Sequence, residues 1–312
     1  VTKPNDIDPG IPANDFTRGQ AFYDLVIEVD PTDDQKLYAG GIDLFRSTNG
    51  GLSWKHISKW HNFNGESPQD YFTDKKLPVP VVHADQHGWA FHPTDPNSAV
   101  IGNDGGVFYA TSLSDAVSST TAIAARNKDY NVTQFYHGAI GQDVNNDVLL
   151  AGAQDNGTQF VANSAAGING TTDIYGGDGA YSFIDKDGEY MIVSYVHNTK
   201  ARIDLPYTGA SVEIDGDQDT GSFINPQGLD HNLDVLYSNA SGGNKDSIAQ
   251  YKDIKTGTPV RKNFSNSLLA GGATAFKVSP YTLNSSTLFI GTGTGKVLKV
   301  TNAESASPTW TK

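Results

Sequence analysis

Short apolar runs alternate with polar turns along most of the chain, and six segments repeat one arrangement of them. Each segment has an apolar run, a polar turn, a second run, a glycine-rich turn and a third run. Side chains at every second position of a strand share one face, and Leu25, Ile27 and Val29 show this alternation. The repeats therefore predict β-strands. They cover residues 24–54, 88–112, 137–160, 180–203, 223–251 and 273–300.

The repeat length predicts the fold. A spacing of about 45 to 60 residues matches β-propeller blades and exceeds that of ankyrin or leucine-rich repeats. We expect an all-β protein, a β-propeller of four-stranded blades, with six blades visible in a six- or seven-bladed arrangement. Residues 1–312 are expected to form a single domain, as a fragment or the mature portion of a longer secreted protein. The stretch 115–125 predicts one short helix, and 307–312 should end where a fourth strand would begin.

The composition narrows the classes of partner. The net charge is −13, whereas phosphate backbones and anionic membranes attract basic surfaces. We therefore expect no nucleic-acid partner, and no membrane insertion, for which every apolar run is too short. The chain has 0 Cys and 1 Met, so it lacks disulfides, thiolate nucleophiles and cysteine-ligated zinc and resists oxidation. With no signal sequence in residues 1–10, this predicts a mature secreted or cell-surface protein.

One turn has a recognisable motif. Residues 47–54 read STNGGLSW, which resembles the Asp-box, Ser-x-Asp-x-Gly-x-Thr-Trp, with Asn in place of Asp and Ser in place of Thr. In such a turn the Asn side chain accepts backbone N–H groups, glycine adopts positive φ, and the tryptophan packs between blades. We assign a structural role to this motif, carried by Ser47, Asn49, Gly51 and Trp54.

The chain is similar to the Asp-box (BNR-repeat) β-propellers, which include sialidases, sortilin-type receptors and two-propeller xyloglucan hydrolases. The segments GGIDLFRSTNGG, VHADQHG, GNDGGV and QDNGT resemble propellers of large secreted bacterial proteins, well over residues 19–185 and loosely beyond. The resemblance implies engagement of an extracellular glycan. A sialidase is disfavoured, because that chemistry needs an arginine clamp on the substrate carboxylate and no Arg-Ile-Pro segment is present. The xyloglucan hydrolases use a cleft between two propellers, whereas this chain supplies one.

Loop positions predict one functional face. In a propeller, the loops that enter each innermost strand and the turns between second and third strands open on the same face. The entering loops are 19–24, 82–87, 133–137 and 176–179, and two of the turns hold Asp104 and Asp155. This face should carry carboxylates, imidazoles and aromatic rings around the channel mouth, with the Asp-box motif on the opposite face.

The segment 82–87 is the strongest candidate site. His83, Asp85 and His87 stand at alternate positions, so on an extended chain their side chains point the same way. Two imidazoles and a carboxylate can ligate a metal, or the carboxylate can act as a general acid or base beside an orienting histidine. Alternatively, the histidines only hold neighbouring loops through hydrogen bonds.

Aspartates beside glycine form a second candidate group. Three alternatives apply to Asp104, Asp155 and Asp178: each can be an Asx turn that satisfies its own backbone, or together they can form a calcium site or the carboxylate pair of a glycosidase. In a glycosidase, carboxylates about 5 Å apart give retention of the anomeric configuration, and carboxylates about 6.5–9.5 Å apart give inversion. The candidate catalytic residues are Asp85, Asp104 and Asp155. The candidate ligand-binding residues are Tyr23, His83, His87, Gln134, Tyr136 and Asp178, and the candidate metal ligands are His83, Asp85 and His87.

Two functions remain open. The first is binding of an extracellular polysaccharide through the channel face, or its hydrolysis as part of a glycoside-hydrolase-like assembly. The second is a non-catalytic adhesin or scaffold that binds a protein partner, with other domains of the same protein as further partners. A divalent cation such as calcium is the candidate cofactor.

Overall fold

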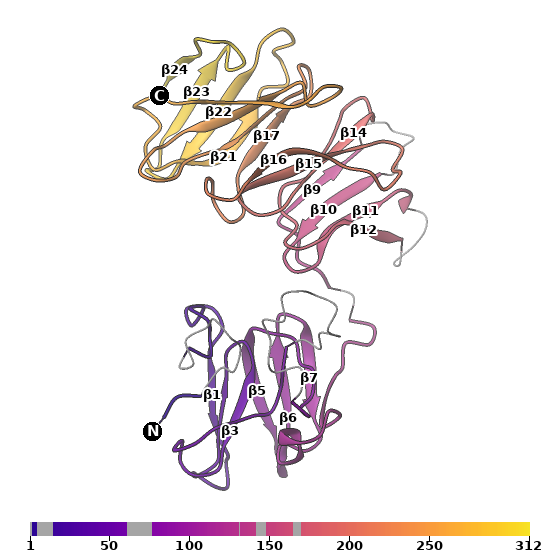
Figure 1. Cartoon of the computed structure of the whole chain (residues 1–312), viewed down its shortest axis with the longest axis vertical. Helices are drawn as coiled ribbons and strands as arrows, with labels where there is room; N and C mark the ends of the chain where they lie inside the picture. The colour runs from indigo at the N-terminus through magenta and orange to yellow at the C-terminus, as the bar shows by residue number, and fades with distance from the viewer. Residues whose placement is uncertain (1, 5–14, 61–76, 131, 142–147, 165–169) are drawn as a thin grey trace. The chain divides into compact units, whose positions relative to one another are not determined.

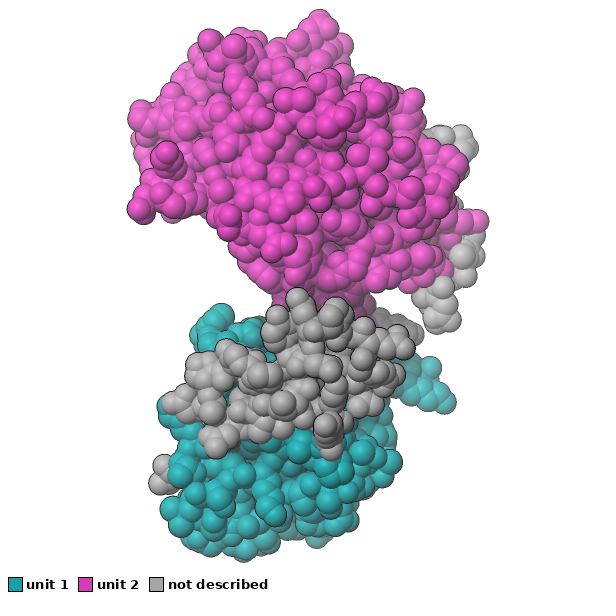
Figure 2. Space-filling view, viewed as in Figure 1, with its two compact units in different colours: residues 1–131 teal, residues 132–312 magenta. Residues whose placement is uncertain are grey.

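The computed structural model describes residues 2–4, 15–60, 77–130, 132–141, 148–164 and 170–312. These residues form two compact units, 1–131 and 132–312, which are coloured separately in Figure 2. Strands in these ranges make six four-stranded antiparallel sheets, two in the first unit and four in the second (Figure 1). The described part of the chain has no helix long and apolar enough to cross a bilayer.

The sheets of the first unit are built from consecutive strands. One sheet contains β1 (Val26–Val29), β2 (Leu37–Gly40), β3 (Leu44–Ser47) and β4 (Lys55–His56). The other contains β5 (Gln86–His92), β6 (Asp95–Asn103), β7 (Gly106–Ala110) and β8 (Ile123–Ala125).

The sheets of the second unit follow the same rule. The third sheet contains β9 (His137–Ile140), β10 (Leu149–Ala153), β11 (Gly157–Val161) and β12 (Thr171–Tyr175). The fourth contains β13 (Phe183–Ile184), β14 (Tyr190–Ser194), β15 (Asn198–Asp204) and β16 (Val212–Asp217). The fifth contains β17 (Gln227–Asp230), β18 (Val235–Asn239), β19 (Ile248–Lys252) and β20 (Val260–Phe264). The sixth contains β21 (Ala273–Val278), β22 (Thr287–Thr292), β23 (Val297–Thr301) and β24 (Thr309–Thr311).

The predicted fold class is confirmed. In every sheet the strands pair in sequence order, each antiparallel to the next, which is the arrangement of a β-propeller blade. The six predicted repeats correspond to the first three strands of the six sheets. The structure also shows two differences. The stretch 115–125 forms one 3₁₀ turn, Asp115–Val117, and then β8. Residues 309–311 form the fourth strand of the last sheet, because they pair with β23.

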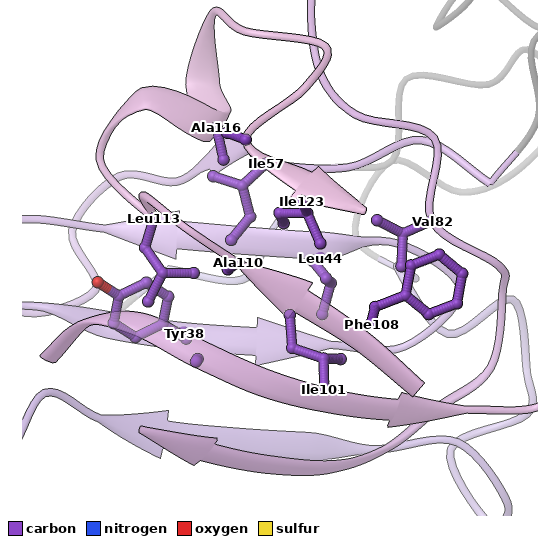
Figure 3. Close-up of a cluster of buried hydrophobic side chains, with 12 residues drawn as sticks. Tyr38, Leu44, Ile57, Val82, Ile101, Phe108, Ala110, Leu113, Ala116 and Ile123 are labelled. Carbon is purple, nitrogen blue, oxygen red and sulfur yellow. The ribbon is translucent and has the colours of Figure 1, made fainter. Parts of the chain in front are cut away.

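The core of the first unit lies between its two sheets. Leu44 on β3 and Ile101 on β6 are 0% exposed and belong to one cluster of buried apolar side chains (Figure 3). Rings also join the sheets, since Tyr38 on β2 lies 5.0 Å from Trp89 on β5, measured between ring centroids. Burial of this apolar surface is what holds the two sheets together.

The second unit has three such clusters, each shared by consecutive sheets. Leu150 on β10 packs with Met191 on β14 in one cluster, and Tyr190 on β14 shares a second with Leu236 on β18. A third cluster includes Tyr237 on β18 and Leu288 on β22. Within the second unit, each four-stranded sheet therefore packs against the next one in the sequence, as blades do.

Glycine is required where the third and fourth sheets approach. A Cβ on Gly179 would lie 2.1 Å from the carbonyl oxygen of Gly157, whereas a Cβ on Gly176, in the same loop, would meet nothing within 4 Å. We expect Gly179→Ala to lower the free energy of unfolding by about 1–3 kcal/mol, because backbone must shift to admit the methyl group. Gly176→Ala is the matched control and should leave the urea unfolding midpoint near that of the wild type. Equal midpoints for the two variants would contradict this prediction.

Candidate functional site

A partly exposed carboxylate in the first unit is held by a tyrosine and a histidine. The hydroxyl of Tyr23, in the loop before β1, lies 3.0 and 3.1 Å from the two carboxylate oxygens of Asp104, in the turn between β6 and β7. His87 on β5 places its Nε2 2.5 Å from Oδ1 of the same carboxylate. The two rings meet edge to face, with centroids 4.7 Å apart and planes at 77°. These three predicted residues therefore form one ordered group, called here the Tyr23–His87–Asp104 surface.

Two further carboxyls lie close to this surface and are buried. Asp24 is 0% exposed and Asp85 is 8% exposed. Burial, and then the negative charge of Asp85, raises the pKa of Asp24 to about 6. The pKa of Asp85 is also raised, by burial first and by the charge of Asp104 second. A carboxylate oxygen of Asp85 lies within 4.8 Å of one of Asp104.

The backbone at Asp85 changes the predicted geometry of the segment 82–87. Asp85 has a φ of +62°, so the chain is not extended there and the expected alignment of His83, Asp85 and His87 does not occur. His83 is half-buried, and its Nδ1 lies 3.2 Å from the carbonyl oxygen of Ala84. Among the described residues these three side chains do not form a group of ligand atoms within 4.8 Å of one another.

Buried amides fix the loops that carry the site. The Nε2 of Gln86 donates to the carbonyl oxygens of His83, at 2.6 Å, and Ile42, at 3.3 Å. Asn103 donates to Oε1 of Gln86 at 3.3 Å and accepts the N–H of Gly105 at 3.0 Å. The side chain of Gln86 therefore ties the segment 82–87 to the turn after β2 in one sheet and to the end of β6 in the other.

Gly105 is also required beside His83. A Cβ on Gly105 would lie 2.3 Å from Cβ of His83, which excludes any other residue without a shift. The absence of a side chain at Gly105 thus lets the turn between β6 and β7 pack against the segment 82–87.

The second unit has its own group of predicted residues. Tyr136 donates from its hydroxyl to Oε1 of Gln154 at 2.5 Å, and the N–H of Asp155 donates to Oδ1 of Asp178 at 3.1 Å. Asp155 has a φ of +58°, a conformation that aspartate tolerates better than most residues. Gln134 is exposed in the loop before β9. The structure therefore distributes the predicted residues over two groups, one in each unit.

Asp24, Gln86 and Asn103 were not identified from the sequence. Asp24 ends a loop that was predicted to face the site, but an aspartate just before a strand resembles any turn residue. Gln86 and Asn103 flank the predicted residues, and only their burial, at 0% and 9% exposed, separates them from surface amides.

The turn at residues 47–54 has the predicted backbone hydrogen bonds and positive φ, whereas Trp54 does not belong to the buried cluster of the first unit. Oδ1 of Asn49 accepts the N–H of Ser53 at 2.9 Å, and Oγ of Ser47 accepts that of Gly51 at 2.9 Å. Gly51 has a φ of +79°. The indole N–H of Trp54 donates to the carbonyl oxygen of Thr2 at 3.0 Å. These contacts close the loop between β3 and β4.

Comparison with known proteins gives a likeness of structure alone. No family model matches the chain, and no curated protein matches it. Among solved structures, a crystal structure of a nidogen/laminin complex resembles it with a TM-score of 0.44 and 11% sequence identity, over 68% of this chain and 77% of that one. A likeness at this level carries no inference about family or activity, so the function must be argued from the residues of the site.

Proposed function

We propose that this chain is a secreted or cell-surface β-propeller protein of the Asp-box type that binds a neutral extracellular glycan. The binding site is the Tyr23–His87–Asp104 surface of the first unit. The observation that carries this proposal is the Asp104 carboxylate, whose side chain is 20% exposed and is held at fixed geometry beside exposed aromatic rings, with Tyr23 51% and the adjacent Phe22 90% exposed.

The chemistry of this surface suits a sugar. A carboxylate accepts two hydrogen bonds side by side, which matches neighbouring hydroxyl groups of a sugar ring. Tyrosine and phenylalanine rings offer apolar faces against which the C–H face of the sugar can pack. The Asp104 carboxylate needs no rearrangement before binding, because Tyr23 and His87 already hold it. The net charge of −13 favours a neutral polymer over an acidic one.

The binding prediction is tested with the tyrosine ring. In calorimetric titrations with a panel of plant and algal polysaccharides, we expect Tyr23→Ala to weaken binding at least tenfold, or about 1.4 kcal/mol. The variant loses both the ring and the hydroxyl that orients Asp104. Tyr281→Ala is the control, since Tyr281 is 91% exposed and lies in the second unit. Equal loss in both variants, or no binding to any polymer by the folded wild type, would leave a protein-binding scaffold as the better proposal.

Glycoside hydrolysis is a second candidate, favoured by the raised pKa values of Asp24 and Asp85. A carboxyl whose pKa is raised keeps its proton to a higher pH and is thereby better suited to act as a general acid. Release of reducing sugar that is lost in Asp85→Asn and kept in Asp178→Asn would support this candidate. Binding without release would restrict the function to recognition.

A further inference from the structure

The second unit repeats the exposed aromatic pair of the first. Phe22 and Tyr23 lie in the loop that enters the first sheet, and the same two residue types, Phe135 and Tyr136, lie in the loop that enters the third sheet ahead of β9. Phe135 is 45% exposed and Tyr136 is 46% exposed. A single exposed apolar side chain needs no explanation, but the same exposed pair in the entering loops of two sheets indicates a shared use.

The hydroxyl of Tyr136 is held in the same manner as that of Tyr23. It donates at 2.5 Å to Oε1 of Gln154, in the turn between β10 and β11, whereas the hydroxyl of Tyr23 bonds Asp104 in the turn between β6 and β7. Both acceptors therefore lie in a turn between the second and third strands of a sheet. The two tyrosines differ in reach, because Tyr23 bonds a turn of the neighbouring sheet and Tyr136 bonds a turn of its own sheet. In each unit a polar side chain is thus fixed beside an exposed ring before any ligand binds.

Further contacts order the polar groups around Gln154. The N–H of Asp155 donates to Oδ1 of Asp178 at 3.1 Å, and the carbonyl oxygen of Gln154 accepts the side-chain amide of Asn156 at 2.9 Å. Both carboxylates also lie near Tyr195, since burial first and the charges of Asp178 and Asp155 second raise the pKa of its hydroxyl. An amide and two carboxylates therefore adjoin the exposed rings, and this group is called here the Tyr136–Gln154–Asp178 surface.

We propose that the Tyr136–Gln154–Asp178 surface is a second glycan-binding site, so that each unit binds the same neutral polysaccharide. This inference rests on the function proposed for the first unit. The side-chain amide of Gln154 can donate to one sugar hydroxyl while the carboxylate of Asp178 accepts from another, and the rings of Phe135 and Tyr136 can pack against the C–H face of the sugar. The negative charge of the two aspartates disfavours an acidic polymer.

The repeated structure of a polysaccharide gives two sites a purpose. One polymer molecule contains many copies of the same sugar, so it carries ligands for both surfaces. Linked binding at two sites can give a higher overall affinity than either site reaches alone. The binding to polymer that remains after Tyr23→Ala is then due to the Tyr136–Gln154–Asp178 surface.

The number of sites is tested by calorimetric titration of the whole chain. The probe is a short oligosaccharide cut from the polymer of the plant and algal panel that the wild type binds most tightly. We expect two binding sites in each wild-type chain, one in Tyr23→Ala, one in Tyr136→Ala and none in the variant that combines both substitutions. Tyr281→Ala, at a 91% exposed position of the second unit, is the control and should keep two sites.

The pattern of losses separates this inference from the function on which it rests. Each variant should melt near the wild-type temperature, and Phe135→Ala replaces Tyr136→Ala if the latter does not fold. A single site that is lost in Tyr23→Ala and kept in Tyr136→Ala would overturn the second site and leave the first. A single site lost only in Tyr136→Ala would support the second unit and refute the site proposed in the first. A folded wild type that binds no polymer of the panel would overturn both.

Discussion

Replacing Lys200 by methionine is expected to remove a large pH dependence of stability. Lys200 on β15 is 0% exposed, and burial lowers the pKa of its ammonium from 10.5 to about 7, with Asp215 opposing and Arg261 adding to the shift. Its Nζ donates to Oδ1 of Asn198 at 2.8 Å and also lies 3.2 Å from the hydroxyl of Ser238. These contacts hold the amine in a polar group inside the second unit.

The direction of the effect follows from proton binding. Between about pH 7 and pH 10.5 the unfolded chain keeps a proton on this lysine, whereas the folded chain has released it, so stability rises with pH. The slope is about 1.4 kcal/mol for each pH unit, or up to about 3 kcal/mol from pH 7.5 to pH 9.5. Below about pH 7 both states bind the proton and the slope vanishes.

Urea unfolding across this range provides the measurement. In Lys200→Met the free energy of unfolding should change little with pH over this range. The variant should fold, because Oδ1 of Asn198 still accepts hydrogen bonds from Asn225 and Ser238. Lys277→Met, at an exposed position of β21, is the control and should keep the wild-type slope. A slope that persists unchanged in Lys200→Met would show that other groups cause it.

Truncation of Ile101 is expected to destabilise the first unit by about 2–5 kcal/mol. Ile101 is 0% exposed on β6, within the buried cluster drawn in Figure 3, so Ile101→Ala leaves a cavity between the two sheets. Val100→Ala, one residue earlier on the same strand and 45% exposed, is the control and should cost less than about 1 kcal/mol.

Tryptophan fluorescence can follow this transition. Trp54, Trp60 and Trp89 belong to the first unit, and Trp310 belongs to the second. A urea titration of the intrinsic fluorescence therefore reports mainly on the first unit. A similar decrease in the free energy of unfolding for Ile101→Ala and Val100→Ala would contradict the burial of one face of β6.

The repeats were predictable because strand patterns are local. Alternating apolar residues followed by glycine-rich turns specify a strand, a turn and the next strand without reference to distant residues. The fourth strands were harder to identify. β4, Lys55–His56, and β24, Thr309–Thr311, are short and consist mostly of polar residues. Their strand conformation therefore depends on pairing with β3 and β23.

The Tyr23–His87–Asp104 surface was predicted in part. All three residues were expected on one face from the positions of their loops, and the structure brings them into contact. The alignment of His83 with Asp85 and His87 did not occur, because Asp85 adopts a positive φ. The sequence gives no sign of this positive φ, because aspartate adopts both this conformation and ordinary extended conformations.

By itself, the sequence determined the all-β class and the repeated strands, because both depend on residues close together in the chain. Only the tertiary structure decided which polar groups are buried and which of them find partners. Asp24 looks like an ordinary turn aspartate until the packing of the first unit removes its side chain from water. Lys200 looks like a surface lysine until the neighbouring sheet covers it. Burial is a property of the packed sheets, so the shifted pKa values of both side chains arise at that level.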